Sequence, residues 1–178
     1  MKPVKVVILA ALVFVIVFAV ASASADPVQR FKPGDQTIAE IAVGSDDFET
    51  LVAALSCTGL VPAVADPYAE LTVFAPTDDA FAALNLYPDT ICGAFDTETL
   101  TAILLYHVVG ERRPSPSVIN GQNKSIWMLA GGAIYPQGKG SLALFDNLDR
   151  QTNIVAADVM ASNGIIHVVD NVLLPVAP

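Results

Sequence analysis

Histidine is scarce in this chain of 178 residues, since His107 and His167 are the only two. Cysteine is equally scarce, and the two cysteines have no histidine near them and match no zinc-binding spacing. A Gly-x-Ser-x-Gly nucleophile motif is missing, and no acidic segment has the ligand spacing of an EF-hand. We therefore expect no metal site, no cofactor and no catalytic residue.

Positive charge is also in short supply. The chain has nine Lys and Arg residues and 18 Asp and Glu residues. Lys2 and Lys5 lie within residues 1–25, so residues 26–178 hold seven positive and 18 negative charges, a net charge of −11. Binding to phosphate backbones and to anionic lipid depends on clustered Lys and Arg. The sequence therefore predicts no nucleic-acid partner and no attraction to anionic lipid.

The one long apolar run stands at the start of the chain. Residues 6–20 are apolar, two lysines precede them, and two Ala-x-Ala sites follow within residues 21–25. This order is typical of a cleaved secretory signal, whereas a retained membrane anchor, the alternative, usually has about 20 apolar residues. We expect removal of residues 1–25, an N-terminal extension at 26–36, and a mature protein without a membrane span. It would be extracellular, or periplasmic or at the cell surface if bacterial.

The two cysteines, Cys57 and Cys92, are expected to pair. An even number of cysteines in an exported chain favours a disulfide, which would stabilise the fold by about 3–4 kcal/mol through the loop that it closes. Two buried free thiols are the alternative that the sequence leaves open.

Helical patterns dominate the first half of the mature chain. Four segments begin with a capping side chain and continue with apolar residues at helical spacing. Ser45 is expected to cap the second of them, and one buried strand interrupts the series. The helical segments are 37–44, 45–59, 77–84 and one that starts at Asp96–Thr97, and the strand is 71–76.

From Pro114 onward, short apolar runs alternate with Gly, Asn and Pro. Such punctuation is typical of short strands joined by turns. No internal repeat or interdomain linker is evident, so we predict one domain of mixed α and β structure, whose second half is a compact β-sandwich or barrel-like unit. The expected strands are 125–129, 132–135, 141–145, 152–160 and 164–174.

Three features of this half have a structural interpretation that we favour. Residues 138–143 match the pattern Gly-x-Gly-x-x-Ala, but a strand pattern follows them instead of a helix, so they predict a hairpin turn. Asn123 starts a glycosylation acceptor, which matters only in a eukaryotic source. Trp127 is expected in the core, although an exposed tryptophan would suit stacking on sugars.

Both histidines lie in apolar segments that suggest strands, where alternation places each on a face with aliphatic residues. A histidine in such surroundings is more often a hydrogen-bonded core residue than a general base. Asp170 follows His167 by three residues and therefore falls on the opposite face of a regular strand. We expect structural roles for His107 and His167, and an exported hydrolase that uses either one is the least favoured alternative.

Three segments, in this order, resemble the signatures of the fasciclin domain family. "LTVFAPTDDAFAAL" at 71–84 resembles the first signature, and "LLYHVV" at 104–109 resembles the Tyr-His segment that follows it. "NGIIHVVDNVLLP" at 163–175 resembles the second signature. The resemblance covers residues 37–175 and implies an α+β fasciclin-like fold, with N-terminal helices packed on a twisted β-sandwich or wedge.

The resemblance also implies a function and four contact residues. It implies a secreted, non-enzymatic protein that mediates cell-surface or extracellular-matrix adhesion through protein contacts. In animal members, integrin binding is linked to the Tyr-His segment, here Tyr106 and His107, and to an Asp-Ile dipeptide, here Asp158 and Val159. An integrin-like partner is expected only if the host has integrins, and Tyr106 and His107 are more readily explained as fold residues.

A second hypothesis is binding of extracellular polysaccharide. Exposed aromatic side chains such as Trp127 or Tyr135 would then stack on sugar rings. Exposure separates the hypotheses, because a contact residue must reach the surface and a core residue need not.

Overall fold

The computed structural model describes residues 34–119, 125–137 and 142–175, and every statement about the structure refers to these ranges. The predicted signal, most of the predicted extension, Asn123 and the two glycines of the 138–143 motif lie outside them. None of the helices in the described ranges is long and apolar enough to cross a membrane.

The four predicted helices are present within these ranges, together with three short ones. The additional helices are α3, α5 and α7, which have five, four and five residues and are therefore too short to show a helical period in the sequence. The helices are α1 (Ile38–Val43), α2 (Glu49–Thr58), α3 (Val61–Ala65), α4 (Asp78–Ala82), α5 (Ile91–Ala94), α6 (Thr97–Leu105) and α7 (Ser115–Ile119).

The strands form one sheet with the order β2-β1-β7-β6-β5-β4-β3. Strand β1 runs parallel to β7, and all other neighbours are antiparallel. A strand lies in each segment predicted from 71–76 and from Pro114 onward, but the last one ends at Val169 instead of 174, and the chain has an α+β fold. The bounds are β1 (Leu71–Pro76), β2 (Val108–Val109), β3 (Ile126–Trp127), β4 (Ala133–Pro136), β5 (Ala143–Phe145), β6 (Gln151–Ala161) and β7 (Gly164–Val169).

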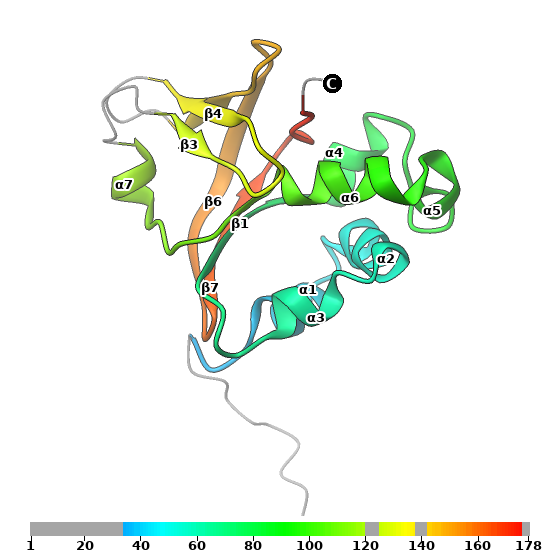
Figure 1. Cartoon of the computed structure of the whole chain (residues 1–178), viewed down its shortest axis with the longest axis horizontal. Helices are drawn as coiled ribbons and strands as arrows, with labels where there is room; N and C mark the ends of the chain where they lie inside the picture. The colour runs from blue at the N-terminus through cyan, green and yellow to red at the C-terminus, as the bar shows by residue number, and fades with distance from the viewer. Residues whose placement is uncertain (1–33, 120–124, 138–141, 176–178) are drawn as a thin grey trace, which may run out of the picture. The chain divides into compact units, whose positions relative to one another are not determined.

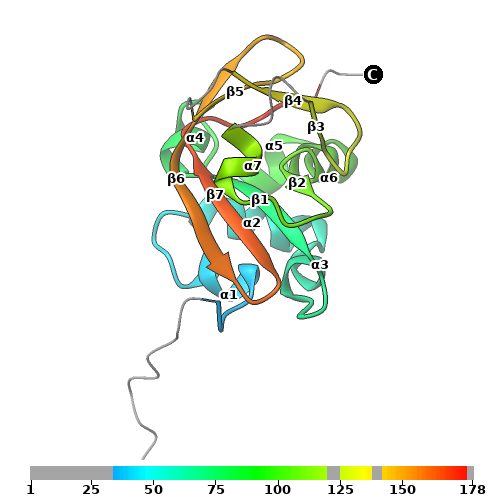
Figure 2. The same cartoon turned by 90° about the vertical axis from the view of Figure 1, so that its left-hand side faces the viewer.

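Strands β1 and β7 are buried on both faces. Helices α1–α6 cover one face, and β3, β4 and α7 lie on the other (Figure 1); Figure 2 views the sheet from the side of α7. Val73, Ala75 and Ile166 belong to the core shared with the helices, whereas Phe74 and Val169 belong to the core shared with the other strands. This double burial explains why both strands are continuous apolar runs.

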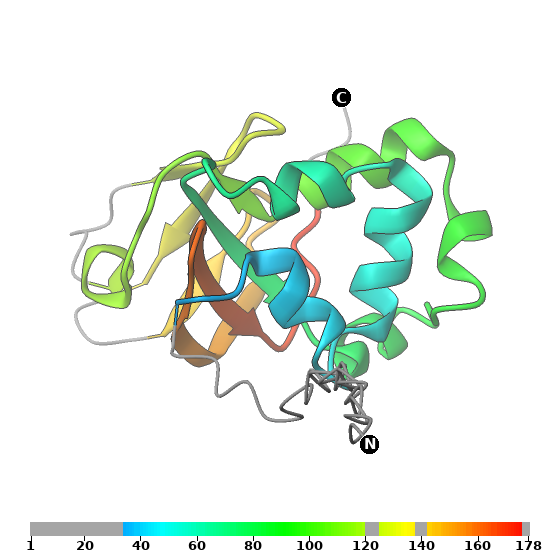
Figure 3. The same ribbon diagram turned by 90° about the horizontal axis from the view of Figure 1, so that it is seen from below.

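The predicted caps hold for three of the four predicted helices. Thr37 forms a capping box with Glu40 at α1, Thr77 caps α4 and Asp96 caps α6. Figure 3 shows α1 and α2, in blue and cyan, beside each other on the helical side of the sheet.

Helix α2 is the exception, because it begins at Glu49 and Ser45 does not cap it. The N–H groups of Glu49 and Thr50 donate instead to the two carboxylate oxygens of Asp78, at 3.1 and 2.8 Å. Asp78 is the first residue of α4, so one helix supplies the cap of another. The local sequence could not predict this cap, because its acceptor, Asp78, lies 29 residues after Glu49.

A disulfide joins α2 to α5. It links Cys57 to Cys92, whose Cα atoms are 5.8 Å apart, a usual separation for a bridged pair. Since α5 has only four residues and cannot hold itself in place, the covalent bond fixes it against the longer helix.

The turn between β6 and β7 is held by a fully buried asparagine. The side chain of Asn163 accepts from the Ile38 N–H at 2.9 Å and donates to the carbonyls of Val64 and Asp66 at 2.9 Å each. One side chain therefore joins the start of α1 and the end of α3 to the sheet. The next residue, Gly164, has to be a glycine, because a Cβ at this position would lie 2.3 Å from the Leu71 carbonyl oxygen.

Replacing Asp78 with alanine should lower the free energy of unfolding by about 1–2 kcal/mol, because α2 loses its cap. Asp79→Ala is the matched control, since Asp79 also lies in the first turn of α4 and should change stability by less than about 0.5 kcal/mol. Urea unfolding followed by circular dichroism measures both. Equal losses in the two variants would show that Asp78 does no more than favour its own helix.

Candidate functional site

The Tyr-His pair lies in the turn between α6 and β2. The expected strand at His107 is wrong, because Tyr106 ends the helix and its N–H still donates to the Ala102 carbonyl at 2.9 Å. The aliphatic residues around His107 therefore belong to the end of α6 and to the two-residue strand β2. Both side chains point inward, since Tyr106 is 0% and His107 is 2% exposed.

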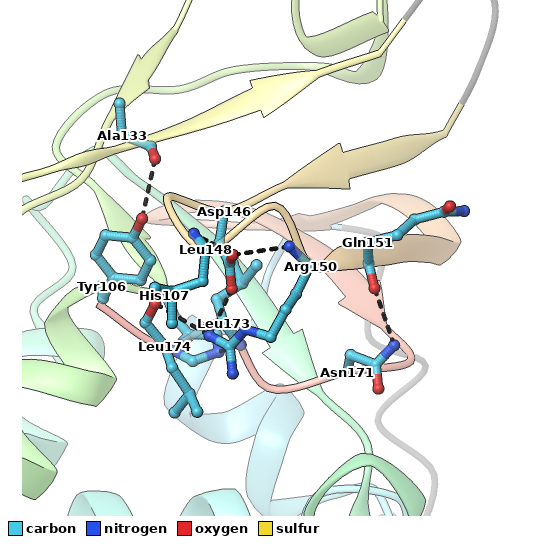
Figure 4. Close-up of polar contacts among 10 residues, drawn as sticks. All are labelled: Tyr106, His107, Ala133, Asp146, Leu148, Arg150, Gln151, Asn171, Leu173 and Leu174. Atoms are coloured by element: carbon cyan, nitrogen blue, oxygen red, sulfur yellow. Dashed lines mark hydrogen bonds and ion pairs between the residues drawn. The ribbon is translucent and has the colours of Figure 1, made fainter. Parts of the chain in front are cut away.

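His107 bridges two distant backbone segments. Its Nε2 accepts from the Leu173 N–H at 2.9 Å, so Nδ1 must carry the proton and donates to the Ile103 carbonyl at 2.8 Å. The ring thus joins the last turn of α6 to the segment that follows β7. Figure 4 shows its bond to Leu173. Neither nitrogen is left for proton transfer.

Tyr106 makes a second inward bond from the same turn. Its hydroxyl donates to the Ala133 carbonyl in β4 at 2.9 Å (Figure 4). Burial raises the pKa of Tyr106 above its ordinary value, so the phenol stays protonated and remains a donor. Tyr106 and His107 therefore connect one turn to β4 and to the segment that follows β7.

The turn between β5 and β6 is fastened to the same C-terminal segment. The buried carboxylate of Asp146 accepts from the N–H groups of Leu148 and Arg150 at 2.8 and 3.1 Å and forms an ion pair with the Arg150 guanidinium. Nη2 of Arg150 also donates to the Leu174 carbonyl at 3.2 Å (Figure 4). His107 and Arg150 thus form hydrogen bonds with two adjacent residues after β7, Leu173 and Leu174.

His167 forms the second buried bridge, in the middle of β7. Its Nδ1 accepts from the Asp158 N–H at 3.3 Å, so Nε2 carries the proton and donates to the Arg113 carbonyl at 2.9 Å. The ring also lies against Phe74, with centroids 5.5 Å apart. His167 therefore has the opposite tautomer from His107, and each tautomer is set by backbone partners.

A β-bulge in β6 brings Asp158 to His167. The register of β6 against β7 shifts twice between Ile154 and Val159, and Asp158 has a φ of +58°, in the left-handed region. The acid nearest to His167 is therefore on the neighbouring strand. Asp170 instead accepts from the backbone N–H and side-chain amide of Asn153 at 2.7 and 2.8 Å.

The Asp158 carboxylate is engaged at the start of α7. Oδ1 accepts from the Ser115 N–H at 2.7 Å, and Oδ2 accepts from the Ser115 hydroxyl. Burial acts to raise the pKa of Asp158, but the bonds from Ser115 and the neighbouring His167 outweigh it, so the pKa lies below the ordinary value. Asp158 and Val159 are both half-buried, and Val159 packs against the helix-side core.

Four predicted contact residues thus fall into two pairs. Tyr106 and His107 have no surface with which to touch a partner, and their side chains hold the C-terminal segment and β4. Asp158 and Val159 reach the surface in part, so a contact role for them stays a prediction. The space beside His107 among the helices has a volume of only about 20 Å³, enough for one water molecule.

The aromatic side chains of β3 and β4 lie differently. The expectation that Trp127 is a core residue is wrong, because its side chain is 70% exposed, and Tyr135 is 43% exposed. Ile126 and Ile134 are the strand neighbours that fill the core. Alternation along β3 is as expected, but the face that carries Trp127 is uncovered.

A family model for the fasciclin domain matches residues 46–175. The chain belongs to the fasciclin domain family. Among solved structures, this fasciclin domain resembles a FAS1 domain pair from the insect cell adhesion molecule Fasciclin I, with a TM-score of 0.66 and 18% identity, over 79% of this chain and 51% of that one. At that identity the likeness supports the fold.

Several curated proteins also resemble this fasciclin domain. Protein sll1483 of Synechocystis is 39% identical over 140 residues, which are 78% of this chain and 73% of that protein. The transforming growth factor-beta-induced protein ig-h3 of Sus scrofa is 32% identical over 142 residues, 79% of this chain and 20% of that protein. Human periostin is 26% identical over 144 residues, 81% of this chain and 16% of its own length.

The sequence alone does not reveal three residues of this site. Ser115 binds Asp158, Arg150 holds the chain end and Asn163 holds the β6–β7 turn. Only Asn163 gives a local signal, because an Asn-Gly pair before an apolar run indicates a hairpin. Asp158 lies 43 residues after Ser115, and Leu174 lies 24 residues after Arg150, and no pattern in the sequence links these pairs.

Replacing His107 or His167 with alanine should lower the free energy of unfolding by about 1–3 kcal/mol each, because backbone groups inside the protein lose their partners. Urea denaturation of the two variants and the wild type measures the loss. Full stability in both variants would contradict the structural role that their hydrogen bonds indicate.

Acid should weaken the fold through the same histidines. Burial lowers the pKa of His107 from 6.5 to about 4 and that of His167 in the same direction. Because the folded pKa is below the unfolded one, the stability that neutral His107 contributes is complete above pH 6.5 and is lost as the pH falls toward 4. The wild type should lose about 2–3 kcal/mol more than His107→Gln between pH 7.5 and 4.5. Parallel pH curves for the two proteins would contradict this.

Proposed function

We propose that this fasciclin domain is a secreted, non-enzymatic module that mediates adhesion at the cell surface or in the extracellular matrix through protein contacts. The observation that carries the proposal is the use of both histidines as backbone bridges, each with both nitrogens bonded to the fold. Because both histidines are bonded to the backbone through both ring nitrogens, we expect the domain to act through contacts at its surface. The insect protein of similar fold, Fasciclin I, is a cell adhesion molecule, which agrees with the proposal.

The acidic charge supports a protein partner, and the N-terminal apolar run supports a location outside the cell. Residues 26–178 carry a net charge of −11, from seven basic and 18 acidic residues, which disfavours nucleic acid and anionic lipid. The apolar run at 6–20 and the small residues that follow support export by a cleaved signal.

We place the partner contact at the bulge of β6 that holds Asp158 and Val159. A carboxylate offers about four lone-pair sites, and Ser115 occupies two of those on Asp158. The remaining sites can accept from a partner without loss of the bonds to α7. Tyr106 and His107 support this contact indirectly, because they hold the sheet and the C-terminal segment in place.

The proposal is tested by capture of partners on immobilised protein that starts at residue 26. Intact cells of the source organism and solubilised matrix protein are the two samples. Asp158→Asn keeps an acceptor oxygen for Ser115 but removes the charge, so we expect about tenfold weaker capture with little change in the unfolding midpoint.

Ser115→Ala is the matched control, because it removes one bond to Asp158 and keeps the carboxylate. It should capture as well as the wild type. No capture by the wild type would overturn the adhesion function, whereas full capture by Asp158→Asn would overturn the contact at β6 and leave the adhesion function standing.

A further inference from the structure

An uncovered face of the sheet carries an aromatic row. Along β3, β4 and β5 the residues of one face fill the core, namely Ile126, Ile134 and Leu144, each at most 1% exposed. The opposite face carries aromatic side chains: Trp127 is 70% exposed, Tyr135 is 43% exposed and Phe145 is half-buried. Tryptophan is a residue that folding normally buries in large part, so its exposure needs an explanation.

Strand register places the three rings next to one another. Tyr135 and Phe145 are direct partners in the β4–β5 pair, and direct partners have Cβ atoms about 4.5–5.5 Å apart. Trp127 pairs with Ala133, two residues before Tyr135, so Trp127 and Tyr135 are diagonal neighbours at about 7–8 Å. Ala133 has too small a side chain to separate the two rings. The result is a row across three strands that starts at the sheet edge, since β3 is the last strand.

Polar groups adjoin the aromatic row at one side. Tyr135 and Phe145 line an open hollow together with Pro136, Gln137 and Asp149. Gln137 and Asp149 are exposed, and Asp149 is held in a turn with a φ of +55°. The hollow thus combines aromatic surface with an amide and a carboxylate, groups that donate and accept hydrogen bonds.

We propose that this face binds an extended, neutral polysaccharide. The C–H faces of sugar rings are apolar and stack on aromatic rings, while their hydroxyl groups accept hydrogen bonds from amide N–H groups and donate to amide and carboxylate oxygens. An apolar partner surface would leave Gln137 and Asp149 without partners at a cost, whereas a sugar satisfies them.

Charge selects neutral sugars over acidic ones. Among the described residues that line the hollow, one is acidic and none is basic. Residues 26–178 have a net charge of −11, seven basic against 18 acidic. A polyanion such as a uronate polymer would be repelled. The proposed face is separate from the β6 bulge, so this inference goes beyond the protein-mediated adhesion proposed above and does not depend on it.

Native gel electrophoresis in gels that contain hydroxyethyl cellulose, with dextran and polygalacturonate as further gels, tests the proposal. We expect a neutral polymer to retard the protein and polygalacturonate to leave its mobility unchanged. Trp127 is the only tryptophan of the chain, so its fluorescence should shift to shorter wavelength when the same neutral polymer covers it.

Variants locate the site. Trp127→Ala and Tyr135→Ala should each weaken binding about tenfold, and circular dichroism should show them folded, because both side chains lie outside the core. Tyr68→Ala is the matched control, since Tyr68 is 92% exposed in the loop before β1, and it should bind as the wild type does. Asp158→Asn should also bind unchanged, which separates this site from the protein contact.

Three outcomes would overturn the inference. The first is unchanged mobility and fluorescence of the wild type with both neutral polymers. The second is retardation that Trp127→Ala retains in full. The third is loss of cell or matrix-protein capture in Trp127→Ala without polysaccharide binding, which would assign the aromatic row to a protein partner.

Discussion

The parallel pairing of β1 with β7 is the constraint on which the rest of the structure depends. It places the two signature segments side by side in register, from Leu71 with Gly164 to Pro76 with Val169, and it buries both strands on both faces. Backbone groups near these strands are thereby removed from water and need internal partners. Three buried polar side chains supply them: His107, His167 and Asn163 each join segments that are distant in sequence. The signature residues are therefore best understood as parts that make this pairing possible.

This constraint also commits both histidines to the fold. A histidine with one nitrogen donating and the other accepting within the fold is an inert crosslink, even when an aspartate stands next to it, as Asp158 does beside His167. The two proposed contact surfaces are the half-exposed β6 bulge and the aromatic face of β3–β5. The first presents a carboxylate and the second presents aromatic rings, so the two surfaces are proposed for different chemical classes of ligand.

Local patterns predicted the elements well and their partners poorly. Thr37, Thr77 and Asp96 cap the helices that they precede, because capping depends on residues within one turn. The predicted cap of α2 was wrong, because the residue that caps it, Asp78, belongs to another helix. His167 and Asp170 have separate partners, as the odd spacing indicated, but the bulge that aims Asp158 at His167 has no local signature.

By itself the sequence determined the family, through its three signature segments, and the inward position of both histidines. It also determined the longer helices and the strands after Pro114, because apolar period and capping residues act over a few positions. Only the tertiary structure decided which faces are covered and which polar groups meet. Alternation in β3 separates Ile126 from Trp127 but does not say which of them faces a neighbour. In β7 both faces are covered, and in β3–β5 only one is, since the helices pack against the centre of the sheet and leave its outer strands open on one side. Because the outer strands are covered on one face only, Trp127 lies at the surface and not in the core, where it was expected.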